Sequence, residues 1–138
     1  MSISNTAHLA GEFLVAGELS RRGYPVSITM GNAKSVDIYA ETEQTVIKID
    51  AKASRLKTSW PIFEKAVRND MFYIFVNLRT MKEVDKKLAP EYFIVKGEEI
   101  LSNKLINTNW RSMQGILYST LNTEEYRERW DKLPSPRS

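Results

Sequence analysis

The sequence has no cysteine and a single histidine, His8. Without cysteine the chain can form neither disulfide bonds nor thiolate metal sites, and one histidine leaves a zinc site almost without ligands. Any bound metal is therefore expected to be held by oxygen atoms. His8 itself is predicted to be an ordinary surface residue.

The sequence also lacks a long hydrophobic run. Its longest nearly apolar stretch, residues 71–78, is far shorter than the roughly 20 residues that a membrane-spanning helix needs. The N-terminus does not show the basic start and apolar stretch of a signal peptide. We therefore expect no membrane association and a cytoplasmic location.

Neither sign of charge dominates, because the net charge is only +3. A mildly basic chain is compatible with nucleic-acid binding, but many proteins with other partners share this property. The length of 138 residues suits a single core. We predict one domain over residues 1–133 and a flexible tail over residues 134–138, which are rich in proline and serine.

Hydrophobic periodicity predicts an α/β fold with a mixed central sheet flanked by helices. The first helix is expected over residues 6–22, with Ser4, Asn5 or Thr6 as its N-cap and Gly23 after its end. Its predicted buried face consists of Leu9, Phe13, Ala16 and Leu19. Glu12 lies beside this apolar stripe, an unusual position for a carboxylate.

Residue patterns predict the other elements less completely. Strands are expected over residues 26–29, 36–40, 45–52, 71–78 and 91–95, with a turn at Gly31 and Asn32. The apolar strand 71–78 should be central and covered on both faces. Helices are expected over residues 97–105 and 124–133, a short helix or a helical turn over residues 59–68, and a loop or a fraying helix over residues 79–87.

The strand over residues 45–52 contains the most informative pattern. Strand alternation places Lys48, Asp50 and Lys52 on one face, opposite the apolar residues between them. Asp50 and Lys52 would stand about 7 Å apart along the strand, too far for an ideal direct contact but close enough to share a phosphate. Pairing with the preceding strand would bring Asp37 to the same end of the sheet as Asp50. Two such carboxylates favour a hard divalent cation.

These residues resemble the PD-(D/E)XK nuclease superfamily, including the restriction-endonuclease-like and Holliday-junction-resolvase-like nucleases. Its pattern is an acidic residue on the first helix, an aspartate at a strand start and D/E-x-K on the next strand, filled here by Glu12, Asp37 and Asp50-Ala51-Lys52. Val36 stands where the family name has proline, and Asp50 where glutamate is more usual. The resemblance implies an α-β-β-β-α-β core.

The resemblance also implies a chemistry. Asp37, Asp50 and the Ala51 carbonyl would bind Mg²⁺ or Mn²⁺, Glu12 would complete the metal or water shell, and Lys52 would stabilise the attacking water or the phosphate. The reaction would be hydrolysis of a phosphodiester bond, in DNA by resemblance. Divalent ions and a lysine suit it because negative charge grows on the phosphoryl oxygens in the transition state.

Each candidate residue has a plainer interpretation. Glu18 competes with Glu12 on the same helix, and Asp37 could instead cap the turn after Asn32. Lys48, Arg55 and Lys57 are weaker candidates for nucleic-acid contacts, since exposed lysines also protect strand edges. The three tryptophans could stack on bases but are more often core residues; they are Trp60, Trp110 and Trp130.

Two other functions stay open at the level of sequence. The chain could be an inactive nucleic-acid-binding or protein-binding module that retains the nuclease fold, or an unrelated α/β interaction domain with a coincidental motif. Inactive relatives usually lose the lysine or an aspartate of the motif, and this sequence retains all of them. A homodimer with two sites would help a chain of this size to bind duplex or branched DNA.

Overall fold

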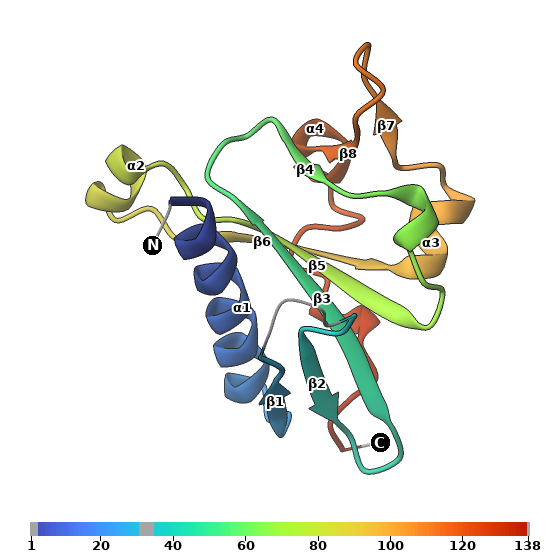
Figure 1. Cartoon of the computed structure of the whole chain (residues 1–138). Helices are drawn as coiled ribbons and strands as arrows, with labels where there is room; N and C mark the ends of the chain where they lie inside the picture. Colours follow the sequence, from blue (N-terminus) through green and yellow to red (C-terminus); the bar gives the residue numbers. More distant parts are fainter. Residues whose placement is uncertain (1–2, 31–34, 138) are drawn as a thin grey trace.

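The computed structural model describes residues 3–30 and 35–137, so the predicted turn at Gly31 and Asn32 lies outside the described residues. Figure 1 shows a central sheet with one long helix on one side and a small second sheet on the other. The elements are α1 (Ile3–Arg21), β1 (Val26–Ile28), β2 (Ile38–Glu41), β3 (Val46–Ser54), β4 (Ser59–Pro61), η1 (Glu64–Ala66), β5 (Met71–Asn77), α2 (Met81–Asp85), β6 (Glu91–Lys96), α3 (Gly97–Ser102), β7 (Asn107–Thr108), β8 (Gln114–Leu117), α4 (Tyr118–Leu121) and η2 (Trp130–Lys132).

The central sheet has the strand order β1-β2-β3-β5-β6. Its neighbours pair antiparallel except β3 and β5, which are parallel, so the sheet is mixed as predicted. Parallel neighbours need a crossover, and the chain makes it through β4 and η1. A second sheet of three strands has the order β4-β8-β7.

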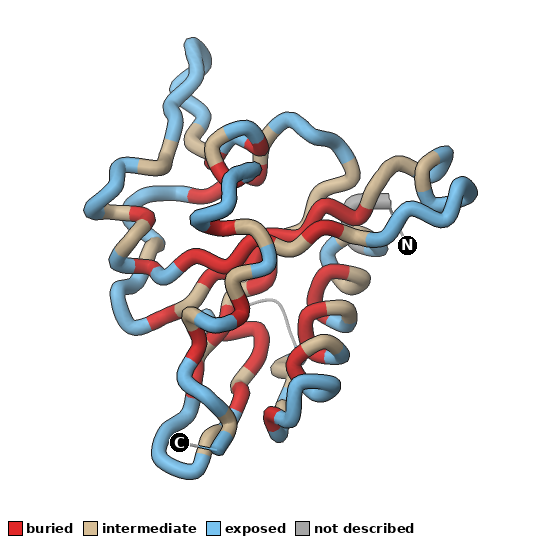
Figure 2. Tube along the Cα trace, turned by 180° about the vertical axis from the view of Figure 1, so that it is seen from behind, coloured by how far each residue is buried: buried red, intermediate tan, exposed pale blue. Residues whose placement is uncertain are grey.

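Hydrophobic residues fill both faces of the central sheet. Strand β5 shows this directly, because Ile74 and Val76 belong to the core under α1, whereas Tyr73 and Phe75 belong to the core on the opposite face. Figure 2 shows the resulting continuous burial along the middle strands. The prediction of a central strand covered on both sides is therefore confirmed.

The first helix differs from its prediction in two respects. It begins at Ile3, so Ser4, Asn5 and Thr6 lie inside the helix and none is its N-cap. Phe13 is 58% exposed, and the predicted buried face was wrong at this position. The helix instead turns Glu12, Val15, Ala16 and Leu19 inward, and Glu12 is only 2% exposed.

Of the short helix or helical turn predicted over residues 59–68, only a single turn is present, and the predicted helix start at residues 59–61 is wrong. Residues 59–68 contain β4 and the single turn η1. Trp60 lies in the extended backbone of β4, and its side chain packs in the core. Its ring is 1% exposed, and its Nε1 donates a hydrogen bond of 3.0 Å to the Val76 carbonyl. Burying this large aromatic side chain against β5 outweighs the local helix signals.

The final helix predicted over residues 124–133 is also wrong. This segment runs beside the edge strand β6 in an irregular, partly extended form that ends in η2. The Ile94 amide donates to the Tyr126 carbonyl, and the Glu128 amide donates to the Tyr92 carbonyl. An edge strand offers unpaired backbone groups. Here they form hydrogen bonds with the segment in place of the hydrogen bonds of a continuous helix.

The C-terminal residues contact the start of the sheet. Leu133 is buried, and the Tyr24 hydroxyl donates a hydrogen bond of 2.6 Å to the Pro134 carbonyl. The flexibility of residues 134–138 stays a prediction. Within the described part of the chain, no helix has the length and apolar character needed to cross a membrane.

Candidate active site

Strand β3 carries a charged pair on one face. Ile47, Ile49 and Ala51 enter the core, as the alternation predicted. Asp50 and Lys52 stand on the opposite face with side chains 22% and 28% exposed. Lys52 Nζ lies 3.3 Å from Asp50 Oδ1, so the expectation that they are too far apart for direct contact was wrong. The flexible lysine side chain closes the separation that the backbone imposes.

Asp37 reaches β3 from the residue just before β2. Its amide donates to the Ile49 carbonyl at 3.0 Å, which continues the pairing of the two strands. Its carboxylate Oδ2 accepts a hydrogen bond of 2.9 Å from the Ala51 amide, beside Asp50. The side chain is therefore fixed across the strand pair, and it is 7% exposed.

Glu12 approaches Asp37 from α1, and the residue before it explains how. At Gly11 a Cβ atom would lie 2.6 Å from the Cβ of Ala53, so only glycine lets the helix come this close to β3. The close approach carries the next residue, Glu12, to the sheet. Burial of Glu12 at 2% exposure follows from this packing.

His8 joins the carboxylates one turn before Glu12. Its Nε2 lies 2.8 Å from Glu12 Oε2, although the imidazole is 54% exposed. One ligand atom each from His8, Glu12 and Asp37 can be chosen so that all lie within 4.8 Å of one another. Sequence reasoning missed this histidine. The signal was present, because residues four apart share one face of a helix.

The electrostatics of Asp50 reflect mainly its burial. Burial raises its pKa, and the neighbouring charge of Asp37 raises it further. Lys52 and His8 act in the opposite direction. A carboxylate that is desolvated and close to another carboxylate is strained when ionised, so a bound cation would be favourable here.

The chemistry of the donor set fits a divalent cation. Carboxylate oxygens suit Mg²⁺ and Mn²⁺, whereas an imidazole nitrogen favours transition metals over Mg²⁺. The expectation that only oxygen atoms would be available was therefore incomplete, because His8 adds a nitrogen. Ala51 is placed beside the group by the hydrogen bond between its amide and Asp37.

The weaker candidates have other contacts. Lys48 forms an ion pair of 3.2 Å with Asp70, and Arg55 donates to the Arg79 carbonyl at 3.3 Å. Exposed Lys57 lies 5.8 Å from the ring of Tyr118. Arg55 and Lys57 lie in the bend between β3 and β4 and do not join the carboxylates.

Two further carboxylates are engaged elsewhere. Glu18, the alternative to Glu12, pairs with Arg21 and Arg22 at the far end of α1. Glu91 is buried but lies 2.7 Å from the Arg127 guanidinium and accepts further hydrogen bonds from Asn77 and Tyr118. Glu91 therefore belongs to a structural network of its own, separate from the carboxylates grouped around Asp37.

The comparisons with known proteins concern the fold. No family model and no curated protein matches the sequence. The chain is similar in structure to a bacterial homing endonuclease, I-Ssp6803I, with a TM-score of 0.59 and 14% sequence identity. The match covers 94% of this chain and 90% of that one. The α/β architecture is thus one that a known nuclease also adopts.

Proposed function

We propose that this chain is a divalent-metal-dependent nuclease of the PD-(D/E)XK type that hydrolyses phosphodiester bonds in DNA. The observation that carries the proposal is the meeting of α1, the start of β2 and the middle of β3. Glu12 and Asp37 offer atoms within 4.8 Å of each other, and Asp37 bonds to the residue between Asp50 and Lys52. Residues distant in sequence thus supply acidic ligands beside a lysine.

Each residue has a distinct proposed task. Asp37, Asp50 and the Ala51 carbonyl hold Mg²⁺ or Mn²⁺, and Glu12 and His8 complete the shell. A cation bound there would polarise the phosphodiester and lower the pKa of a bound water. Lys52 lies beside this group and places its ammonium against the phosphoryl oxygens, where negative charge develops.

The remaining features agree with a DNA substrate. Arg55 and Lys57 lie in the bend that follows β3, and they are proposed as phosphate contacts together with Lys48. The similarity in fold to a homing endonuclease supports the proposal, because that protein is an endonuclease with a similar architecture. Assembly as a homodimer and a cytoplasmic location stay predictions.

Cleavage of supercoiled plasmid and of branched DNA tests the function. Wild type should nick DNA with Mg²⁺ or Mn²⁺ and lose all activity with a chelator. Glu12→Gln and Asp50→Asn should abolish nicking. Glu18→Gln is a matched control on α1. It changes a carboxylate that pairs with Arg21 and Arg22, and it should leave nicking intact.

Lysine variants separate metal binding from chemistry. Lys52→Ala should lower the cleavage rate by about a hundredfold or more, the scale of losing one electrostatic stabiliser, while Mn²⁺ still binds. Lys48→Ala removes a lysine from the same face of β3 and should cost far less. If wild type cuts no DNA with any of these metals but still binds it, the inactive binding module is the correct function.

A further inference from the structure

The hairpin between β7 and β8 projects from the rest of the molecule, at the top of Figure 1. Its base is anchored by β8, whose Ile116 is fully buried and pairs with Trp60 of β4. Gly115 permits this pairing, because a Cβ atom there would lie 2.9 Å from the Trp60 carbonyl oxygen.

The tip of the hairpin is held by Asn109. Its amide donates to the Met113 carbonyl at 2.9 Å, and its side-chain oxygen accepts from the amides of Arg111 and Met113 at 2.9 and 3.0 Å. Ser112 takes the left-handed conformation with φ of 61°. These bonds define the backbone conformation of the turn from which the side chains of the tip project.

That arrangement places an indole in solvent. Trp110 is 85% exposed, whereas Trp60 and Trp130 are 1% and 5% exposed. Met113 beside it is 59% exposed, and the Arg111 guanidinium lies 4.5 Å from the Trp110 ring centroid. A hydrogen-bonded turn that exposes a large aromatic side chain next to a cation is a candidate contact surface.

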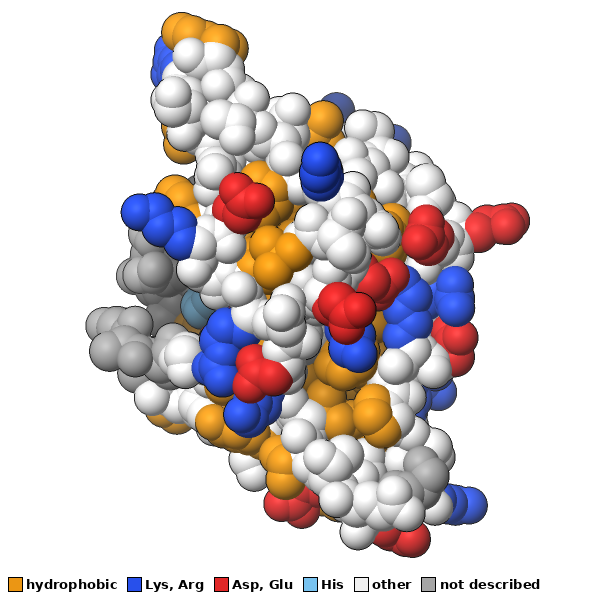
Figure 3. Space-filling view, turned by 90° about the vertical axis from the view of Figure 1, so that its right-hand side faces the viewer, with side chains coloured by type: hydrophobic (Ala, Val, Ile, Leu, Met, Phe, Trp, Pro, Cys, Tyr) orange, Lys and Arg blue, Asp and Glu red, His pale blue; other side chains and the backbone are white. Residues whose placement is uncertain are grey.

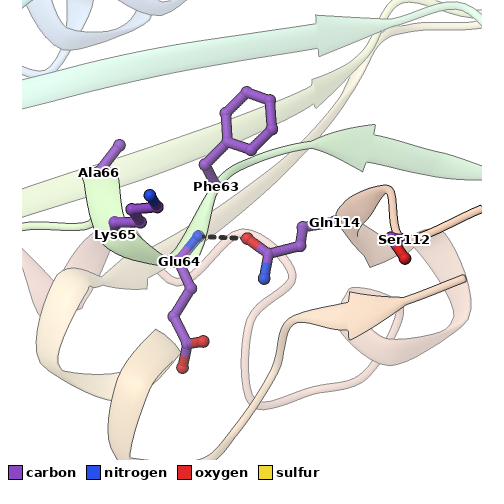
Figure 4. A pocket seen from close by; sticks show the side chains of 6 residues that line it. All are labelled: Phe63, Glu64, Lys65, Ala66, Ser112 and Gln114. Atoms are coloured by element: carbon purple, nitrogen blue, oxygen red, sulfur yellow. Dashed lines mark hydrogen bonds between the residues drawn. The ribbon is translucent and has the colours of Figure 1, made fainter.

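The charge around the tip is suited to a polyanion. Residues 101–123 contain no aspartate or glutamate but include Lys104 and Arg111. The projection at the top of Figure 3 accordingly shows hydrophobic and basic side chains. Below the tip, a shallow pocket is lined by Phe63, Lys65 and Ser112 among others, and Phe63 is 66% exposed (Figure 4). Glu64 also lines it, with its amide bonded to Gln114.

We propose that the hairpin tip is a DNA-contacting element in which Trp110 packs on a base and Arg111 binds a neighbouring phosphate. Indole and guanidinium are the groups that combine base stacking with phosphate binding, and an acid-free segment avoids repulsion of the backbone. This role rests on the proposed nuclease function, but it concerns binding and not the chemistry at Asp37.

DNA binding of Trp110 variants tests the role without cleavage. Affinity for a fluorescent duplex and for a single strand is measured by anisotropy with Asp37→Asn as the parent, so that no product forms. Trp110→Ala should weaken binding at least about fivefold, the lower end expected for loss of one base stack. Arg111→Ala should weaken binding and reduce its salt dependence.

A matched pair of methionine variants controls for general surface effects. Met113→Ala alters the tip and should weaken binding, whereas Met81→Ala alters an equally exposed methionine of α2 and should not. Tryptophan emission gives a direct readout, because Trp110 alone among the three indoles is exposed. Added DNA should quench its emission and protect it from acrylamide.

The outcomes distinguish three situations. If neither wild type nor the parent binds DNA, the proposed function fails together with the hairpin role. If the parent binds DNA but Trp110→Ala binds equally well and the emission of Trp110 is unchanged, only the hairpin role is refuted. If Trp110 becomes protected as protein concentration rises without DNA, the tip contacts a second copy of the chain, which also overturns the proposal.

Discussion

Gly11→Ala should destabilise the protein, although the same change elsewhere on α1 should stabilise it. Gly17 lies on the same helix and is exposed, and a Cβ atom added there would meet no heavy atom within 4 Å. Gly17→Ala should therefore gain up to about 1 kcal/mol from the difference in helix propensity. At Gly11 the same gain is opposed by a clash.

The magnitude of the clash follows from the geometry. The new Cβ would lie 2.6 Å from the Cβ of Ala53. Carbon atoms in contact prefer about 3.5–4.0 Å, so α1 must move away from β3 by roughly 1 Å. Overpacking of this kind costs about 1–3 kcal/mol. Gly11→Ala should thus be about 1–3 kcal/mol less stable than Gly17→Ala.

Thermal and denaturant unfolding of both variants measure this difference. For a chain of this size, 1 kcal/mol shifts Tm by about 3–5 °C. Ala53→Gly in the Gly11→Ala background should restore part of the lost stability, because it removes the atom that the new methyl group meets. Equal stabilisation by both glycine variants would refute the close approach of α1 to β3.

Three further predictions concern charged residues. Mg²⁺ or Mn²⁺ should raise Tm of wild type, because a cation that binds only the folded state relieves repulsion among the carboxylates, and Asp37→Asn should remove most of that increment in a thermal-shift titration. His8→Ala should reduce stabilisation by Mn²⁺ more than by Mg²⁺, since imidazole favours transition metals; equal losses for both ions would exclude His8 as a ligand. Burial raises the pKa of Glu91, but hydrogen bonds from Arg127, Asn77 and Tyr118 outweigh burial and hold the pKa below its ordinary value. Its stabilising contribution is therefore present above the unfolded pKa and is lost as pH falls through the lower folded pKa. Glu91→Gln should flatten the acid limb of a stability–pH curve, and an unchanged limb would contradict this.

The strands near the site could be predicted from sequence because their information is local. Alternation along β3 placed Asp50 and Lys52 on one face, and the apolar run of β5 identified a strand buried on both sides. Both patterns depend only on the period of an extended backbone. Asp37, one residue before β2, could be aligned with Asp50 by the same reasoning.

Other features depended on contacts between distant segments. Trp60 adopts a strand because its ring fits beside β5, and residues 124–133 form an irregular segment because they pair with the edge of β6. Neither cause is visible in a local window. The spacing of four residues places His8 and Glu12 on one helix face. The proximity of His8 to Asp37 depends on the packing of Gly11 against Ala53, which the spacing does not show. The sequence by itself determined the strands of the central sheet and the motif, but not the second sheet of β4, β7 and β8. Tertiary packing decided which side chains meet, because packing energy depends on contacts between segments that are distant in the sequence.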